Sequence, residues 1–133
     1  SPAAISGHAE VAVECVTGPE AICGSTRMKA GTAQKMMLNM ISTETMVRLG
    51  KVYGNLMVDV RPTNEKLVDR ARRIIASATG CDGACAARAL DQSGRDVKVA
   101  ILMVLLDKSP DACREALDAH GGNVSATIRG VRD

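Results

Sequence analysis

The sequence predicts a mainly helical α+β fragment that contains one strand, one long helix and then a run of short helices. Residues 10–16 alternate polar and apolar with β-branched side chains, which is typical of a strand, and residues 26–49 carry apolar side chains at helical spacing. Beyond Pro62, glycine and proline divide the chain into short periodic segments. The length of 133 residues fits one domain, or a small domain with a piece of another. We expect two parts, residues 1–61 and residues 62–133.

The predicted strand at residues 10–16 ends at Gly18-Pro19. A single strand leaves its backbone hydrogen-bonding groups without partners. We therefore expect it to lie at the edge of a parallel sheet formed with other strands.

The long helix is expected over residues 26–49, with Ser25 or Thr26 as its N-cap and Gly50 after its end. Its apolar residues, many of them methionine, occupy more than one face, which indicates a helix packed on several sides. Alone, this chain would leave those faces uncovered, so we expect dimerisation or another assembly. Residues 51–60 fit either a short strand or an extended connection.

The remainder predicts a compact module of short helices. Thr63 or Asn64 caps the first, Ser109-Pro110 starts another, and the glycines before Asn123 separate the last two. The expected helices cover residues 64–78, 83–91, 94–107, 110–119 and 123–131.

Composition argues against several classes of partner. The net charge is only +2 and Tyr53 is the single aromatic residue, so nucleic acid is not expected. Five scattered cysteines are typical of reduced thiols in the cytoplasm, and the spacing of Cys81, Cys85, Cys113 and His120 does not match a zinc site, so we expect no metal and no other cofactor. The apolar run at residues 97–106 is interrupted by Lys98 and is too short to span a bilayer, which excludes a membrane anchor there.

The clearest motif is the glycine-punctuated loop of residues 18–29, which is rich in hydroxyl groups and runs into the long helix. Free backbone N–H groups in a first helical turn attract phosphate or carboxylate. Arg27 and Lys29 lie against the helix dipole there, which costs roughly 0.3–1 kcal/mol each and suggests a functional reason. An ordinary helix start with solvated cations is the alternative. A Walker loop is excluded, because five residues separate Gly18 from Gly24.

Residues 18–35, Asn39 and residues 48–60 together resemble the C-terminal half of N-acetylmuramic acid 6-phosphate etherases. That family shares its Gly-Pro-Glu…Gly-Ser-Thr-Arg-x-Lys signature with the glucokinase regulatory proteins, and the similarity runs from about Ala9 onward. The resemblance implies that residues 1–61 are the C-terminal part of a sugar isomerase (SIS) domain, whose parallel sheet comes from an N-terminal half outside these residues. It also implies a carbon–oxygen lyase of peptidoglycan recycling, cytoplasmic and homodimeric. Its reaction removes the D-lactyl ether, giving N-acetylglucosamine 6-phosphate and D-lactate. The catalytic glutamates would precede this chain, so we expect the fragment alone to be inactive.

The resemblance also assigns candidate site residues. Ser25, Thr26, Arg27 and Lys29 are expected to bind the sugar phosphate or the lactyl carboxylate. Glu20 is the motif's only carboxylate, and we expect it to hold the loop through backbone N–H groups rather than to act as the base. A weaker set, Lys51, Tyr53 and Asn55, is expected to line the site or a subunit interface.

The helices from residue 62 onward are expected to cover the pocket as a lid. Residues 116–128 resemble the last two helices of ubiquitin-associated domains, although Asp107-Lys108-Ser109-Pro110 replaces the apolar loop with which such domains bind. Two other functions stay open: a non-catalytic sugar-phosphate sensor, and a protein-interaction module on the face of residues 110–131.

Overall fold

The computed structural model describes residues 3–132. Contacts divide the chain into two compact units, Ser1–Glu44 and Thr45–Asp133. The mainly helical class predicted from the sequence is confirmed. In chain order the elements are η1 (Ala4–His8), α1 (Ala30–Arg48), β1 (Val52–Tyr53), β2 (Leu56–Met57), α2 (Glu65–Thr79), α3 (Gly83–Gln92), α4 (Val97–Leu106), α5 (Pro110–Ala119) and α6 (Val124–Arg132).

The first unit contains little packed structure. The strand predicted at residues 10–16 is wrong for this structure: the segment is irregular, and its valines are largely exposed, with Val16 at 94%. No strand lies beside it among the described residues, so its backbone groups have no ladder to join. None of residues 3–49 is buried.

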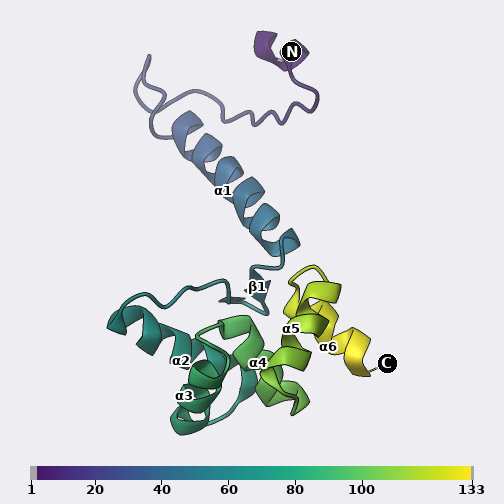
Figure 1. Cartoon of the computed structure of the whole chain (residues 1–133). Helices are drawn as coiled ribbons and strands as arrows, with labels where there is room; N and C mark the ends of the chain where they lie inside the picture. Colours follow the sequence, from purple (N-terminus) through teal and green to yellow (C-terminus); the bar gives the residue numbers. More distant parts are fainter. Residues whose placement is uncertain (1–2, 133) are drawn as a thin grey trace. The chain divides into compact units, whose positions relative to one another are not determined.

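Helix α1 is a continuous helix of 19 residues (Figure 1). It begins at Ala30 rather than Thr26, because residues 27–29 form a turn. It ends as predicted before Gly50. The φ of Gly50 is 67°, a left-handed conformation that glycine adopts without strain because it has no Cβ. The N–H of Lys51 reaches the carbonyl of Met46 and that of Gly50 reaches Val47, both at 3.0 Å, which closes the helix end.

A short antiparallel hairpin follows. Val52 pairs with Met57 and Tyr53 with Leu56, so the strand alternative for residues 51–60 is confirmed for its first part. Gly54, with φ 59°, occupies the first position of the two-residue turn, where a type II′ turn requires glycine. Beyond β2, residues 58–63 form neither helix nor strand, and Val58 is only 1% exposed. The hairpin is thereby fixed to the helices.

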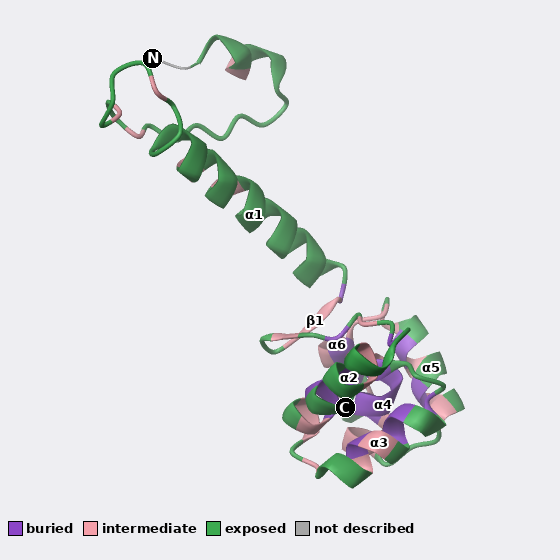
Figure 2. Ribbon diagram, turned by 90° about the vertical axis from the view of Figure 1, so that its left-hand side faces the viewer, coloured by how far each residue is buried: buried purple, intermediate pink, exposed green. Residues whose placement is uncertain are grey.

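Helices α2 to α6 enclose the hydrophobic core. Helix α4 contacts α2, α3, α5 and α6, and its residues Val97, Val99, Ile101 and Leu102 are almost fully buried. Figure 2 shows the buried residues gathered on the inward faces of these helices. The core is therefore aliphatic, with α4 at its centre.

Helices α2, α5 and α6 begin within one residue of their predicted starts. Of the two candidates before α2, Asn64 is the cap, and its side chain accepts from the N–H of Leu67 at 2.9 Å. Ser109 caps α5 with Pro110 in the first turn, and the Asn123 side chain accepts from the N–H of Ala126. The helix expected from residue 94 begins at Val97, because Gly94 and Arg95 both have positive φ.

The predicted boundary after residue 61 assigns the hairpin to the N-terminal part, whereas here the hairpin belongs to the unit that begins at Thr45. Side chains from the hairpin, including Tyr53 and Leu56, pack against the helical core. The division into residues 1–61 and 62–133 stays a prediction for the whole protein. Within residues 3–132, no helix is both long and apolar enough to cross a membrane.

Candidate functional site

Glu20 organises the loop that precedes α1. Its carboxylate accepts hydrogen bonds from the backbone N–H of Lys29, at 3.0 and 3.2 Å, and of Ala30, at 3.1 Å. A carboxylate at the start of a helix interacts favourably with the helix dipole. The expectation that these first N–H groups stay free for a bound anion is therefore wrong at Lys29 and Ala30, because Glu20 already occupies them.

Lys29 is held at two points. Besides its backbone bond to Glu20, its ammonium donates to the carbonyl of Pro19 at 2.8 Å. An ammonium has three donors, so two remain for another acceptor. Lys29 thus closes the loop and still presents positive charge to its surroundings.

The loop centre is shaped by backbone contacts. The N–H of Ser25 bonds to the carbonyl of Ile22 at 3.0 Å, and the N–H of Gly31 bonds to the carbonyl of Thr26 at 2.8 Å. A Cβ on Gly31 would lie 3.1 Å from that carbonyl oxygen, so this close approach favours glycine. The loop is therefore folded against the first turn of α1.

The predicted cap by Ser25 or Thr26 is wrong. Neither side chain accepts from an N–H of α1 within the described residues, and the Ser25 hydroxyl lies 3.5 Å from the N–H of Arg27. Glu20 performs the capping instead, since its longer side chain reaches across the loop. The Ser25 hydroxyl accepts from the Arg27 N–H and can still donate its own hydrogen, and the Thr26 hydroxyl has no hydrogen bond to the described residues.

Arg27 is exposed, and its guanidinium makes no ion pair with any of residues 3–132. A guanidinium offers five N–H donors in a planar fork that matches carboxylate and phosphate groups. With the two hydroxyls and the Lys29 ammonium nearby in sequence, the loop has the donors that an oxyanion needs. The structure thus supplies the chemistry expected of this loop, while the binding role stays a prediction.

The second predicted set lies on the hairpin and is not brought together as a cluster of free groups. Lys51 pairs with Asp59, with its ammonium 3.0 Å from the carboxylate. Tyr53 is half-buried against the helical core, and Asn55 is exposed in the turn between the strands. Lys51 and Tyr53 therefore stabilise this unit, and Asn55 is the member that faces solvent.

Sequence reasoning missed the pairing of Asp59 with Lys98. The Lys98 ammonium donates to the carbonyl of Gly122 at 3.0 Å and lies 3.9 Å from Asp59, and its side chain is only 13% exposed. The hydrogen bond from Lys51 holds the pKa of Asp59 below its usual value, with the charges of Lys98 and Arg61 adding to this against the effect of burial. A lysine inside an otherwise apolar helix was the available signal, because such a residue needs a partner.

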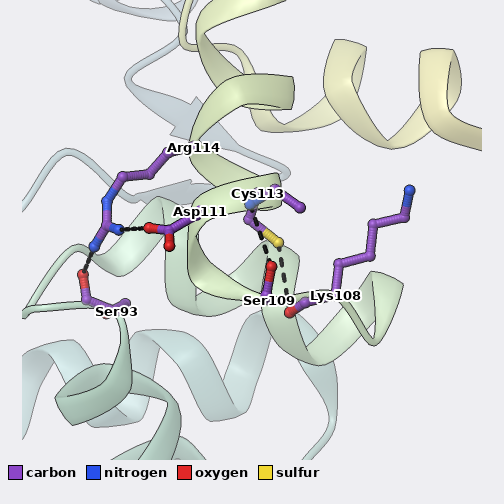
Figure 3. A network of polar contacts seen from close by, with 7 residues as sticks. Ser93, Lys108, Ser109, Asp111, Cys113 and Arg114 are labelled. Atoms are coloured by element: carbon purple, nitrogen blue, oxygen red, sulfur yellow. Dashed lines mark hydrogen bonds and ion pairs between the residues drawn. The ribbon is translucent and has the colours of Figure 1, made fainter.

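A network of polar contacts around α5 holds neighbouring elements together (Figure 3). The Arg114 guanidinium donates to the carbonyl of Ser93 at 2.6 Å and to Asp111 at 3.0 Å, which connects the end of α3 to α5. Cys113 is fully buried, and burial raises the pKa of its thiol. Cys113 is therefore a packing residue rather than a nucleophile. Among residues 3–132, no three histidine, cysteine or acidic side chains are grouped to hold a metal ion.

Comparison with known proteins identifies relatives. No protein-family model matches the chain. It is 53% identical over 130 residues to an N-acetylmuramic acid 6-phosphate etherase of Erwinia tasmaniensis, covering 98% of this chain and 42% of that protein. Identity is 55% over 124 residues to the etherase of Oenococcus oeni, and 54% over 129 residues to that of Clostridium botulinum. These matches cover 93% and 97% of this chain, and 42% and 43% of the two relatives.

The chain thus spans less than half the length of the curated relatives that it matches. The matched region is their C-terminal part. The resemblance drawn from the loop and the hairpin sequence is confirmed.

Proposed function

We propose that the protein to which these residues belong is an N-acetylmuramic acid 6-phosphate etherase. This carbon–oxygen lyase would cleave the D-lactyl ether of its substrate to release N-acetylglucosamine 6-phosphate and D-lactate. The observation that carries the proposal is identity of 53% or more to three curated etherases across at least 93% of the chain. Identity at this level extends over both the loop and the helical unit, so it does not rest on one short motif.

In this proposal the loop before α1 binds the oxyanion of the substrate, either its phosphate or its lactyl carboxylate. Arg27 would bind it through two N–H donors, Ser25 and Thr26 would add hydroxyl contacts, and Lys29 would add charge. The support is that Glu20 and Pro19 fix the loop, while the Arg27 guanidinium is exposed and makes no ion pair within residues 3–132. A fixed loop loses less conformational entropy when a ligand binds.

The acid and base come from elsewhere in the whole protein. Eliminating an ether needs one group to remove a proton and another to protonate the leaving oxygen. Glu20 is unsuited to either role, because its carboxylate is occupied by the N–H groups of Lys29 and Ala30. We therefore expect this chain alone to release no lactate.

The remaining architecture follows the same proposal. Other elements of an SIS-type domain would cover α1. The helical unit would act as a lid, with α5 and α6 arranged as in ubiquitin-associated domains. The whole enzyme would be a cytoplasmic homodimer. The exposed apolar surface of α1, where Leu38 is 61% and Met40 62% exposed, supports a covering element on that helix.

The test is lactate release from N-acetylmuramic acid 6-phosphate by the full-length protein and its Arg27→Ala variant. We expect kcat/KM to fall about 100-fold, since a charged bidentate contact contributes on the order of 3 kcal/mol. Arg72→Ala is the matched control, because Arg72 is an exposed arginine on α2. Equal activity of Arg27→Ala and wild type would refute the assignment of the loop. Sugar-phosphate binding without lactate release would instead favour the non-catalytic sensor.

A further inference from the structure

Two cysteines lie at the corner between α2 and α3, away from the loop to which the proposed etherase chemistry assigns binding. Cys81 lies in the connection after α2, and Cys85 lies in the first turn of α3. Both are half-buried free thiols, whereas Cys15 and Cys23 are exposed and Cys113 is fully buried. The pair therefore combines closeness in the chain with partial access to solvent.

The cap of α3 sets the backbone around the two cysteines. Asp82 accepts from the N–H of Cys85 at 2.7 Å, so the helix begins directly after Cys81. The N–H of Cys81 donates to the hydroxyl of Thr79 at 3.3 Å, which holds this residue outside the helix. Within a helix, residues four apart keep their Cβ atoms about 5–6 Å apart, too far for the 3.5–4.5 Å of a disulfide. Cys81 is free of that restriction, because it precedes the cap.

The two thiols are hydrogen-bonded to each other. This bond is the largest cause that raises the pKa of the Cys85 thiol, with desolvation adding to it and the charge of Arg88 opposing it. A thiol whose pKa rises through a hydrogen bond is the donor, because it loses that bond when it ionises. Cys85 thus donates to the sulfur of Cys81, and a disulfide requires only a short further approach of the two sulfurs.

A small reagent can reach this pair from solvent. Cys85 lines a surface hollow of about 320 Å³ between α3 and α4, together with the side chains of Arg88 and Lys108. Small-molecule sites usually enclose about 300–1,000 Å³, so the hollow admits a compact oxidant or reductant. Cys113 lies below the surface and does not line it.

We propose that Cys81 and Cys85 form a reversible disulfide by exchange with a low-molecular-weight disulfide. The Cys81 thiolate attacks one sulfur of the oxidant, which forms a mixed disulfide and releases one small thiolate. Cys85 then loses its proton and attacks the Cys81 sulfur, which forms the protein disulfide and releases the second small thiolate. The two cysteines give up two electrons and two protons, and the oxidant takes these up to become two thiols. Disulfides in reducing compartments are mostly of this transient kind.

The test is equilibration of the 133-residue chain in buffers of oxidised and reduced glutathione, followed by acid quenching, alkylation and mass spectrometry. Trypsin releases both cysteines in one peptide, residues 74–88, which the disulfide makes lighter by two hydrogen atoms and protects from alkylation. Diluting total glutathione about tenfold at a fixed ratio of its two forms should raise the ratio of disulfide to dithiol about tenfold, because two thiols are released per bond. In Cys81→Ser and Cys85→Ser, the remaining thiol should form only a mixed disulfide, which dilution leaves unchanged.

The same measurement in urea separates contact in the fold from closeness in the chain. The unfolded chain does not hold the two thiols together, so the disulfide fraction should fall at the same glutathione concentrations. Three outcomes would overturn the proposal: full alkylation of peptide 74–88 in the folded chain, mixed disulfides alone, and an equal or larger disulfide fraction in urea. These measurements use the wild-type chain, so they do not require either serine variant to fold. None depends on lactate release, so their failure leaves the etherase proposal untouched.

Discussion

Asp59 connects the hairpin to the helices through two lysines from different elements. The Lys51 ammonium lies 3.0 Å from the carboxylate, and the nearly buried Lys98 lies 3.9 Å away and also donates to the carbonyl of Gly122. One carboxylate therefore offsets positive charge from the hairpin and from α4. The packing of Gly50 agrees with this tight junction, since a Cβ there would lie 2.9 Å from the same carbonyl oxygen of Gly122.

This arrangement predicts a specific dependence of stability on pH. The pKa of Asp59 is lower in the folded chain than in the unfolded chain, mainly because Lys51 donates to it. Asp59 therefore stabilises the fold above pH about 4, and this contribution is lost as the pH falls through the folded-state pKa. Because its side chain is 43% exposed, solvent screening keeps the effect modest.

The measurement is the unfolding temperature of wild type and Asp59→Asn between about pH 6 and pH 3. The difference between the two should be largest at pH 6 and should shrink toward pH 3. Asp111→Asn is the control, because the Asp111 side chain is 90% exposed beside Arg114. A constant difference between wild type and Asp59→Asn across the range would contradict the role of the ionised carboxylate.

At the scale of the element, α1 is a helix whose apolar side chains are not buried. Met36, Leu38, Met40 and Ile41 are each between 49% and 62% exposed, and they lie on more than one side of the helix. Isolated helices are marginal in water, and most helical stability in proteins comes from a packed apolar face. The helix therefore needs a covering surface, which the rest of the protein or a second copy would provide.

We predict that this chain self-associates through α1. Replacing both Met36 and Met40 with lysine should shift the sedimentation profile toward the monomer, because it removes adjacent apolar groups from one helix face. Asn39→Lys adds a cation to the same helix without removing an apolar side chain, so it should associate more strongly than the double variant. A wild-type chain that stays monomeric at high concentration would contradict this prediction.

The elements that were predictable from sequence are those whose signals are local. Asn64 and Ser109-Pro110 mark helix starts within a few residues of the groups that they contact, and the structure has helices there. Residues 10–16 have no neighbouring strand among the described residues, so their alternating pattern alone was insufficient to predict a strand. The Glu20 cap joins residues nine and ten positions apart, and Lys98 meets Asp59 only through the fold.

At the scale of the whole molecule, the two units differ in what stabilises them. The unit from Thr45 onward contains the aliphatic core, in which Ile75, Leu90, Ile101 and Leu102 are essentially inaccessible to solvent. None of residues 3–49 is buried, so the first unit has no comparable source of stability. Local opening should therefore be far more frequent before residue 50 than within α2 to α6.

Limited proteolysis with trypsin should reveal this difference. Arg27, Lys29 and Lys35 are exposed in the first unit and should be cut early. The lysines and arginines of α2 to α6 should be cut only when the core unfolds, because a protease needs an extended, accessible segment. Mass spectrometry should therefore find a resistant fragment that begins between residues 28 and 52 and retains α2 to α6.

A core variant separates local opening from global unfolding. Ile101→Ala should destabilise the core by about 2–5 kcal/mol and speed the loss of the resistant fragment. Cleavage after Arg27 should keep its wild-type rate, because that residue lies in the other unit and depends on local opening. An equal acceleration by Ile101→Ala of the cleavage after Arg27 and of the loss of the resistant fragment would contradict this prediction. The two units would then unfold as one cooperative body, with the first unit stabilised by the core of the second.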